Sequence, residues 1–200
     1  MRQCTLLMVI LLSVLTVGRT HAEQDIILKM RLCPSVWSQS SIGEKLRIQF
    51  SRNQGLRIIE VADDNCNPPD FPVDAYNLDS LVAWGTETGT RYLMFVDVHS
   101  ERLERKKKWH LPLVFHMYET VAAIEGELRY VDLSRGRLIL AESFKVEEKA
   151  ASCFQPALYD DINDPRLIPT VTAKVRLFDR LEDKLCRNLV DLVSANTRAR

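Results

Sequence analysis

The sequence predicts an α+β domain in which helices pack on a mixed β-sheet, with elements in the order β-α-β-α-β-β-β-α. Three observations predict this fold. Two apolar segments near the amino-terminus are each followed by a helical pattern, a central apolar run is followed by a hairpin pattern, and a long amphipathic repeat closes the chain. We expect residues 23–200 to form this single α+β domain, preceded by a signal peptide at residues 1–22.

Residues 1–22 carry the features of a cleavable secretory signal. Arg2 gives a positive head, residues 6–15 form an apolar core, and residues 20–22 (THA) form a small-residue cleavage site. The alternative is an uncleaved membrane anchor, but the apolar core is shorter than the ~20 residues that span a bilayer. We therefore expect an exported protein, cleaved after Ala22, that is not an integral membrane protein.

The first part of the mature chain predicts a strand, a helix and a second strand. Residues 25–32 place apolar side chains on one face of a strand. Residues 41–52 then repeat apolar side chains at the i, i+4 and i+8 spacing of an amphipathic helix. Residues 56–62 (LRIIEVA) form the second strand. The helix residues expected to dock on the sheet are Ile42, Leu46 and Phe50.

A second helix and a central strand are expected next. Asp74 or Asn77 can cap the first turn of the helix, and Gly89 is placed to end it. The strand over residues 91–103 begins with an apolar run, YLMFV, that lacks alternation. Such a run is typical of a strand covered on both faces, so we expect it in the middle of the sheet. The inward residues of the helix are expected to be Leu78, Leu81 and Val82.

A hairpin and a long helix complete the fold. Residues 117–132 and 137–146 predict two strands joined by residues 133–136, where Gly136 supplies the positive φ of a tight turn. An amphipathic helix is expected over residues 170–194 because apolar side chains recur every three or four positions. These side chains are Val171, Val175, Phe178, Leu181, Leu185, Leu189 and Leu192.

The charge balance excludes one class of partner. The chain holds 27 acidic and 27 basic residues, and two of the basic ones, Arg2 and Arg19, lie in the signal. The mature chain therefore carries a net charge of about −2. General nucleic-acid binding needs a basic field that releases counterions from phosphate, and we expect no such binding here.

Four of the five cysteines remain after signal cleavage, because Cys4 leaves with the signal. An even number in an exported protein predicts two disulfides. Cys33 and Cys66 each follow a strand of a parallel pair, so we pair them with each other, and Cys153 then pairs with Cys186. The absence of a C-x-x-C spacing argues against a zinc site.

Few residues suggest catalysis. His99, His110 and His116 survive signal cleavage, and Ser100 follows His99. No G-x-S-x-G motif accompanies them, which favours surface histidines over a hydrolase. We therefore predict no enzyme, no catalytic residue and no cofactor.

The acidic segment at residues 160–164 offers oxygen ligands of the kind that calcium prefers. It lacks the central glycine and the closing glutamate of a calcium-binding loop, and Pro165 follows at once. A solvated loop is the better interpretation, so no metal site is predicted. The oxygen-bearing residues are Asp160, Asp161, Asn163 and Asp164.

One basic segment is the candidate contact patch. Four cations stand beside a tryptophan, and the apolar residues 111–115 follow. This combination suits an envelope protein or an anionic envelope surface, whereas the alternative is a hairpin tip whose charges prevent aggregation. The patch residues are Arg105, Lys106, Lys107, Lys108 and Trp109.

Two segments carry a family resemblance. Residues 81–98 (LVAWGTETGTRYLMFVDV) resemble the helix, glycine and central strand of bacterial envelope assembly domains. Residues 124–142 (IEGELRYVDLSRGRLILAE) resemble the long strand, aspartate-containing turn and return strand of the same domains. The pattern is similar to that of the curli-secretion lipoproteins, the penicillin-binding-protein activator lipoproteins and the TolB amino-terminal domain.

The resemblance implies a periplasmic, non-catalytic domain that binds other envelope proteins and can assemble into rings. The lipoprotein members carry a cysteine at the cleavage point, whereas Ala22 and Glu23 stand here. This departure implies a soluble periplasmic protein and argues against a ring or pore in the outer membrane.

We therefore expect an exported interaction or assembly module of the bacterial cell envelope, with oligomerisation left open. The alternative is a small-ligand-binding protein or an enzyme whose pocket is lined by the histidines and by Trp37, Trp84 and Trp109.

Overall fold

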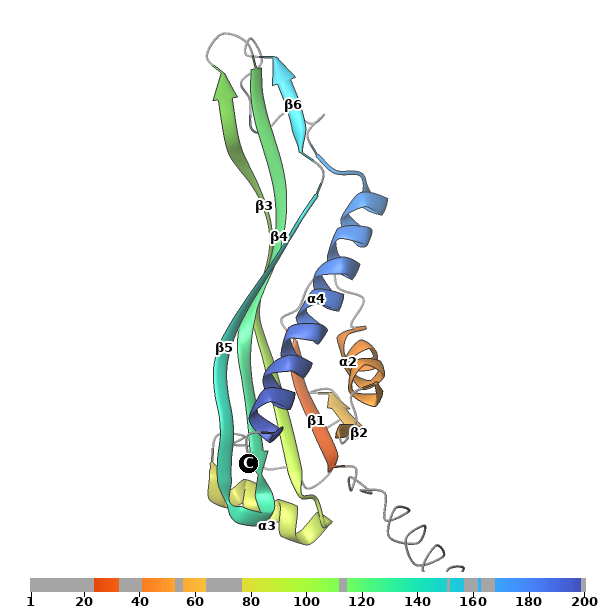
Figure 1. Ribbon diagram of the computed structural model, residues 1–200, viewed down its shortest axis with the longest axis vertical. Helices are drawn as coiled ribbons and strands as arrows, with labels where there is room; N and C mark the ends of the chain where they lie inside the picture. The colour runs from red at the N-terminus through yellow and green to blue at the C-terminus, as the bar shows by residue number, and fades with distance from the viewer. Residues whose placement is uncertain are drawn as a thin grey trace, which may run out of the picture.

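The computed structural model describes residues 24–32, 41–52, 56–63, 77–111, 115–150, 152–156, 162 and 168–198. Helices and strands combine in one α+β arrangement, as predicted (Figure 1). The elements are β1 (Gln24–Leu32), α2 (Ile42–Ser51), β2 (Leu56–Asp63), α3 (Leu78–Thr88), β3 (Tyr92–Leu111), β4 (Phe115–Asp132), the 3-10 turn η1 (Leu133–Arg135), β5 (Arg137–Lys149), β6 (Cys153–Pro156) and α4 (Val171–Arg198).

The sheet has the strand order β2-β1-β3-β4-β5, and the short β6 pairs with β4. β1 runs parallel to both β2 and β3, whereas β3, β4 and β5 form antiparallel pairs. The sheet is therefore mixed, and β3 lies in its middle, which confirms the prediction made from its apolar run.

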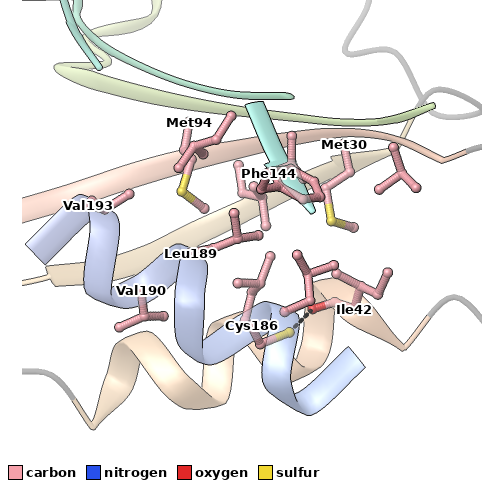
Figure 2. Packing of buried hydrophobic residues seen from close by; sticks show 14 of the residues in the cluster. Met30, Ile42, Met94, Phe144, Cys186, Leu189, Val190 and Val193 are labelled. Carbon is pink, nitrogen blue, oxygen red and sulfur yellow. Dashed lines mark hydrogen bonds between the residues drawn. The ribbon is translucent and has the colours of Figure 1, made fainter. Parts of the chain in front are cut away.

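Helices cover the two faces of the sheet unequally. α2 and α4 pack on one face and bury a large cluster with β1, β3, β4 and β5, part of which appears in Figure 2. α3 covers the other face at one end only, where a second cluster joins Ile27, Leu81, Trp84, Leu93, Val131 and Leu133. Tyr92, Met94, Val96 and Val98 of β3 enter the first cluster and Leu93 enters the second, which explains why the run YLMFV is apolar on both faces.

Predicted helix signals are confirmed where local chemistry fixes them. The Asn77 side chain accepts hydrogen bonds from the backbone N–H groups of Asp79 and Ser80, and so caps α3. Gly89 ends that helix with a φ of 70°, and Gly136 ends the hairpin turn with a φ of 58°. The α2 residues Ile42, Leu46 and Phe50 are buried, as expected.

Several bounds differ from the sequence prediction. β3 continues to Leu111, eight residues beyond the expected end, because its charged second half pairs with β4. The strand β6 was not predicted, and β5 ends at Lys149. At the start of α4, Val171 and Val175 are 71% and 41% exposed. The helix crosses a twisted sheet, so its buried side instead takes in Val190 and Val193 near the other end.

Gly126 allows β4 to pass close to a bulge in β3. The register between β3 and β4 shifts between Val98 and Ser100. A Cβ atom at position 126 would lie 2.7 Å from Cζ of Phe144 and even closer to the carbonyl oxygen of Asp97. Only glycine fits there without moving the backbone. Within the described residues, no helix is long and apolar enough to cross a membrane.

Candidate functional site

The outer ends of β3 and β4 form an arm, defined here as residues 104–111 of β3 and 115–121 of β4. Neither hydrophobic cluster reaches into these residues, and Leu103 is the last β3 side chain to pack on the main core. The two strands continue past α2 and α3, and β6 pairs with β4 beside them (Figure 1). Within the arm, most of the β4 residues are buried, whereas the cations at positions 106–108 of β3 are exposed, so the accessible surface of the arm lies mainly on β3.

The candidate contact patch lies inside this arm. Lys106, Lys107 and the rest of the segment belong to β3, where Lys106 is paired in register with Glu119 and Lys107 with Tyr118. The patch therefore lies within the paired strands, near the outer end of the β3–β4 hairpin. Trp109 is part of the same strand, and its side chain falls outside the described atoms.

Strand alternation divides the four cations between two faces. Lys106 Nζ lies 3.3 Å from a carboxylate oxygen of Glu104, and Lys108 Nζ lies 3.5 Å from one of Glu119. Arg105 points to the other face and donates a hydrogen bond to the carbonyl oxygen of Ile162. The cations therefore do not form one continuous basic surface, and part of their charge is balanced by neighbouring carboxylates.

The open face of the sheet below the arm carries a ladder of ion pairs. Lys145 Nζ lies 3.0 Å from Glu125 and 3.3 Å from Glu147, and Arg102 also pairs with Glu125. The hydrogen bond with Lys145 lowers the pKa of Glu125, and the same bond raises the pKa of Lys145. Opposite charges alternate across the strands, so this face is well solvated and resists edge-to-edge aggregation.

The candidate histidines do not meet. His99 lies at the β3 bulge, with Nδ1 3.7 Å from Asp97 and Nε2 3.9 Å from Glu127. His110 and His116 are opposite each other in the β3–β4 register, eleven residues further along β3. Eleven strand residues span about 36 Å, so His99 and this pair belong to separate regions.

His99 nevertheless lies near the point where the strand order of the sheet reverses. α2 connects β1 to β2 and packs on one face of the sheet, whereas α3 connects β2 to β3 and packs on the other. Because β1 lies between β2 and β3, the strand order reverses at β1. Ligands in such sheets bind beyond the carboxyl ends of the strands at this reversal of strand order. Here the carboxyl end of β1 presents Arg31, whose Nε donates to Asp97 at 3.0 Å, next to His99.

A charged cluster that the sequence analysis missed joins α2 to α4. Lys45 Nζ lies 2.5 Å from Asp179, 3.0 Å from Glu182 and 3.2 Å from Asp183. Burial by itself lowers the pKa of Lys45, but these three carboxylates outweigh it and raise the pKa above its ordinary value. The acidic residues read as the polar side of an amphipathic helix, so only the docking of α2 reveals the cluster.

The predicted Cys153–Cys186 disulfide is not formed in this structure. Cys186 is a free, buried cysteine whose Sγ lies 3.7 Å from the carbonyl oxygen of Ile42 on α2 (Figure 2). Arg180, six residues earlier on α4, contacts Lys149 of β5. From that contact, α4 leads to Cys186 in one direction and the chain leads to Cys153 in the other, so the two residues diverge.

Several predicted residues lie outside the described residues, and their predictions stand as made. They are Cys33 and Cys66 of the other disulfide, Trp37, and the acidic residues Asp160, Asp161, Asn163 and Asp164. Across the described ranges, no group of three or more histidine, cysteine, aspartate or glutamate side chains is arranged to hold a metal ion. Trp84 is a core residue of the α3 cluster.

Comparisons with known proteins give similar folds at low identity. No family model matches the chain, and no curated protein matches it. A hypothetical protein from Chlamydia trachomatis is 12% identical, with 90% of this chain and 100% of that chain covered and a TM-score of 0.48. A protein from Xanthomonas campestris is 10% identical, with 90% and 88% covered and a TM-score of 0.48.

Several of the similar structures are bacterial lipoproteins. A minor lipoprotein from Acinetobacter baumannii is 12% identical, with 88% of this chain and 94% of that chain covered and a TM-score of 0.41. The curli-secretion, penicillin-binding-protein activator and TolB groups named by the sequence resemblance are not among the structures described here. Because these TM-scores are below 0.5, the likenesses carry no argument about function.

Proposed function

We propose that this protein is an exported, non-catalytic interaction module of a bacterial cell envelope, and that the arm is its contact surface. The single observation that carries the proposal is the arm itself, two paired strands that continue beyond both hydrophobic clusters. The secretory signal and the resemblance of residues 81–98 and 124–142 to envelope assembly domains support the compartment.

The arm offers a surface of mixed charge to its partner. Lys106 and Lys108 are about half exposed even though each faces a carboxylate, and Lys107 is exposed on the opposite face. Exposed cations of this kind steer association with an acidic envelope protein or an anionic envelope surface more than they supply affinity.

The test is capture of the mature protein after crosslinking in the periplasm. We expect one envelope protein to be recovered repeatedly and to be lost when Lys106, Lys107 and Lys108 are all replaced by glutamine. The matched control replaces Arg47, Arg52 and Arg187 by glutamine, which removes the same charge from exposed positions on or next to α2 and α4, away from the arm. Recovery that is equal in both triple variants would contradict the arm as the contact surface.

A second candidate function rests on the region beside His99. The reversal of strand order and the Arg31–Asp97 pair favour a small polar ligand at the carboxyl end of β1. Thermal denaturation with a panel of small carboxylates and phosphates tests this alternative. A rise in Tm that disappears in His99→Ala would favour a ligand-binding protein over the interaction module.

A further inference from the structure

The outer edge of β5 is closed at one end and open at the other. In an antiparallel strand, the N–H and C=O groups of successive residues point to alternate sides. The N–H of Ala150, next after β5, donates to the carbonyl oxygen of Thr120 on β4. Over residues 140–148 of β5, the backbone N–H and C=O groups of the even-numbered residues therefore point toward β4. Those of the odd-numbered residues point away from the sheet.

α4 caps two of the outward carbonyl groups. Lys184 Nζ donates to the carbonyl oxygen of Glu147 at 2.8 Å, and Arg180 Nη2 donates to that of Lys149 at 3.4 Å. Both acceptors are odd-numbered, which agrees with the alternation. A cation that covers an unpaired strand edge prevents another strand from pairing there.

The capping of β5 stops because the next α4 positions along this side carry no lysine or arginine. Four helix residues and two strand residues both advance about 6 to 7 Å, so α4 keeps step with β5. After Arg180 and Lys184, the next positions along this side of the helix are Asn188, then Leu192 with Asp191, and then Ala195. Together they line one shallow surface groove. None of these side chains donates to β5, and the outward backbone groups of Ala141, Ser143 and Lys145 have no hydrogen-bond partner in the described part of the chain.

The charges beside this opening indicate the partner's chemistry. Glu142 lies on the α4 side of β5, and Asp191 lies on α4 at about the same height. Neither carboxylate forms an ion pair with any described residue, unlike Glu147 and Glu148 at the capped end. A residue of an incoming strand directly opposite Glu142 would come close enough for a cation to pair with it.

We propose that the edge window, the outward backbone of Ala141, Ser143 and Lys145, binds one extended peptide segment of another protein, with a lysine or arginine opposite Glu142. The segment adds a strand to the sheet under α4 and rests its small apolar side chains on Leu192 and Ala195. This second contact surface rests on the proposed role as an interaction module but uses none of the arm.

The probe is a fluorescent nine-residue peptide of alternating threonine and valine with one central lysine, compared with the same peptide carrying glutamate. Fluorescence anisotropy with the whole mature protein should show about fivefold tighter binding of the lysine peptide, and Glu142→Gln should remove that preference. Arg187→Gln is the matched control because Arg187 is exposed on α4 but lies outside the groove lining, so it should leave binding unchanged.

Two further variants test the backbone pairing. Ser143→Pro removes an outward N–H that β4 does not use, so the fold should persist while peptide binding is lost. Asn188→Lys places a further lysine where it can donate to the carbonyl oxygen of Lys145, as Lys184 does to that of Glu147, and should weaken peptide binding at least threefold. Hydrogen exchange at the amides of Ala141, Ser143 and Lys145 should slow at least tenfold when the lysine peptide binds.

Either of two results would overturn the window. One is binding that survives both Ser143→Pro and Asn188→Lys. The other is strong protection of the three amides before peptide is added, which would mean that the same chain or a second copy already covers the edge; sedimentation would separate those two cases. Failure here leaves the capture test on the arm variants unaffected, because no arm residue is changed.

Discussion

The helix-covered half of the sheet and the arm are built from the same two strands, β3 and β4, yet they obey different rules. Between Tyr92 and Val98, every β3 side chain is buried: one face packs under α2 and α4, and on the other face Leu93 packs under α3. Beyond Leu103, the same strand carries the charged run 104–108 (ERKKK), in which Lys106 pairs with Glu104 of β3 itself and Lys108 pairs with Glu119 of β4. The strand pairing is continuous, so the difference comes from what covers each face.

This difference teaches that stability and contact surface are separated along one pair of strands. The clusters under α2, α3 and α4 supply the apolar burial that folds the domain. The arm buries little in those clusters, so its sequence is free to serve a partner. The following predictions test this separation, from the largest expected effect to the smallest.

Lys45→Met should cause the largest loss, about 3 kcal/mol in the free energy of unfolding, because it leaves the buried Glu182 beside two other carboxylates without their cation. Urea denaturation at pH 7 measures the loss. The raised pKa of Lys45 means that its contribution is full below about pH 10 and is lost as the pH rises further, so the two proteins should converge in strong base. Arg47→Met, exposed on the same helix, should change little.

Two buried valines give a matched comparison of core and arm. Val193→Ala should cost about 2 kcal/mol because close-packed core residues surround Val193 and cannot fill the cavity. Val121→Ala should cost about half as much, since its register neighbours Glu104 and Lys149 are long side chains that can collapse into the space. Equal losses in urea denaturation would show that the arm is packed like the core.

The thiol of Cys186 reports whether the interface of α2 and α4 is dry. Burial raises the pKa of Cys186 to about 12, so the thiol stays protonated at about pH 8.5, where an unfolded cysteine ionises. Iodoacetamide should label it at least tenfold more slowly than a cysteine placed on the arm by Lys106→Cys. Because the folded pKa is raised, the thiol's contribution to stability is full below about pH 8.5 and declines above it.

Mass spectrometry of the iodoacetamide-labelled protein also tests the cysteine pairing. Labelling of Cys186 in the unreduced protein after denaturation is the expected result. A peptide that links Cys153 to Cys186 would contradict the free thiol in the structure.

Lys106→Gln should have the smallest effect on stability. Lys106 is exposed and its contact with Glu104 is made in solvent, where ion pairs contribute little. The midpoint of urea denaturation should stay within experimental error of the parent protein. A clear fall in that midpoint would mean that the arm's charges stabilise the fold and were not left available for a partner.

Local rules predicted most of the elements. Asn77 and Gly89 bound α3 because capping and positive φ depend on a few adjacent residues. The spacing of Ile42, Leu46 and Phe50 predicted the buried side of α2 in the same way. The charged half of β3 was missed because its run of charged residues shows no apolar alternation, and β6 was missed because so short a strand depends on its partner.

The sequence by itself determined the α+β class, the central place of β3, the hairpin and the long final helix, because periodicity and turn chemistry act over neighbouring residues. Only the tertiary structure decided how the Arg105–Lys108 cations divide between two faces, that Lys45 meets three carboxylates, and that Cys186 stays free against α2. It also decided where α4 stops capping the edge of β5. These features join residues far apart in the chain, and their contacts depend on the register of the strands and the crossing of the helices, which no local pattern encodes.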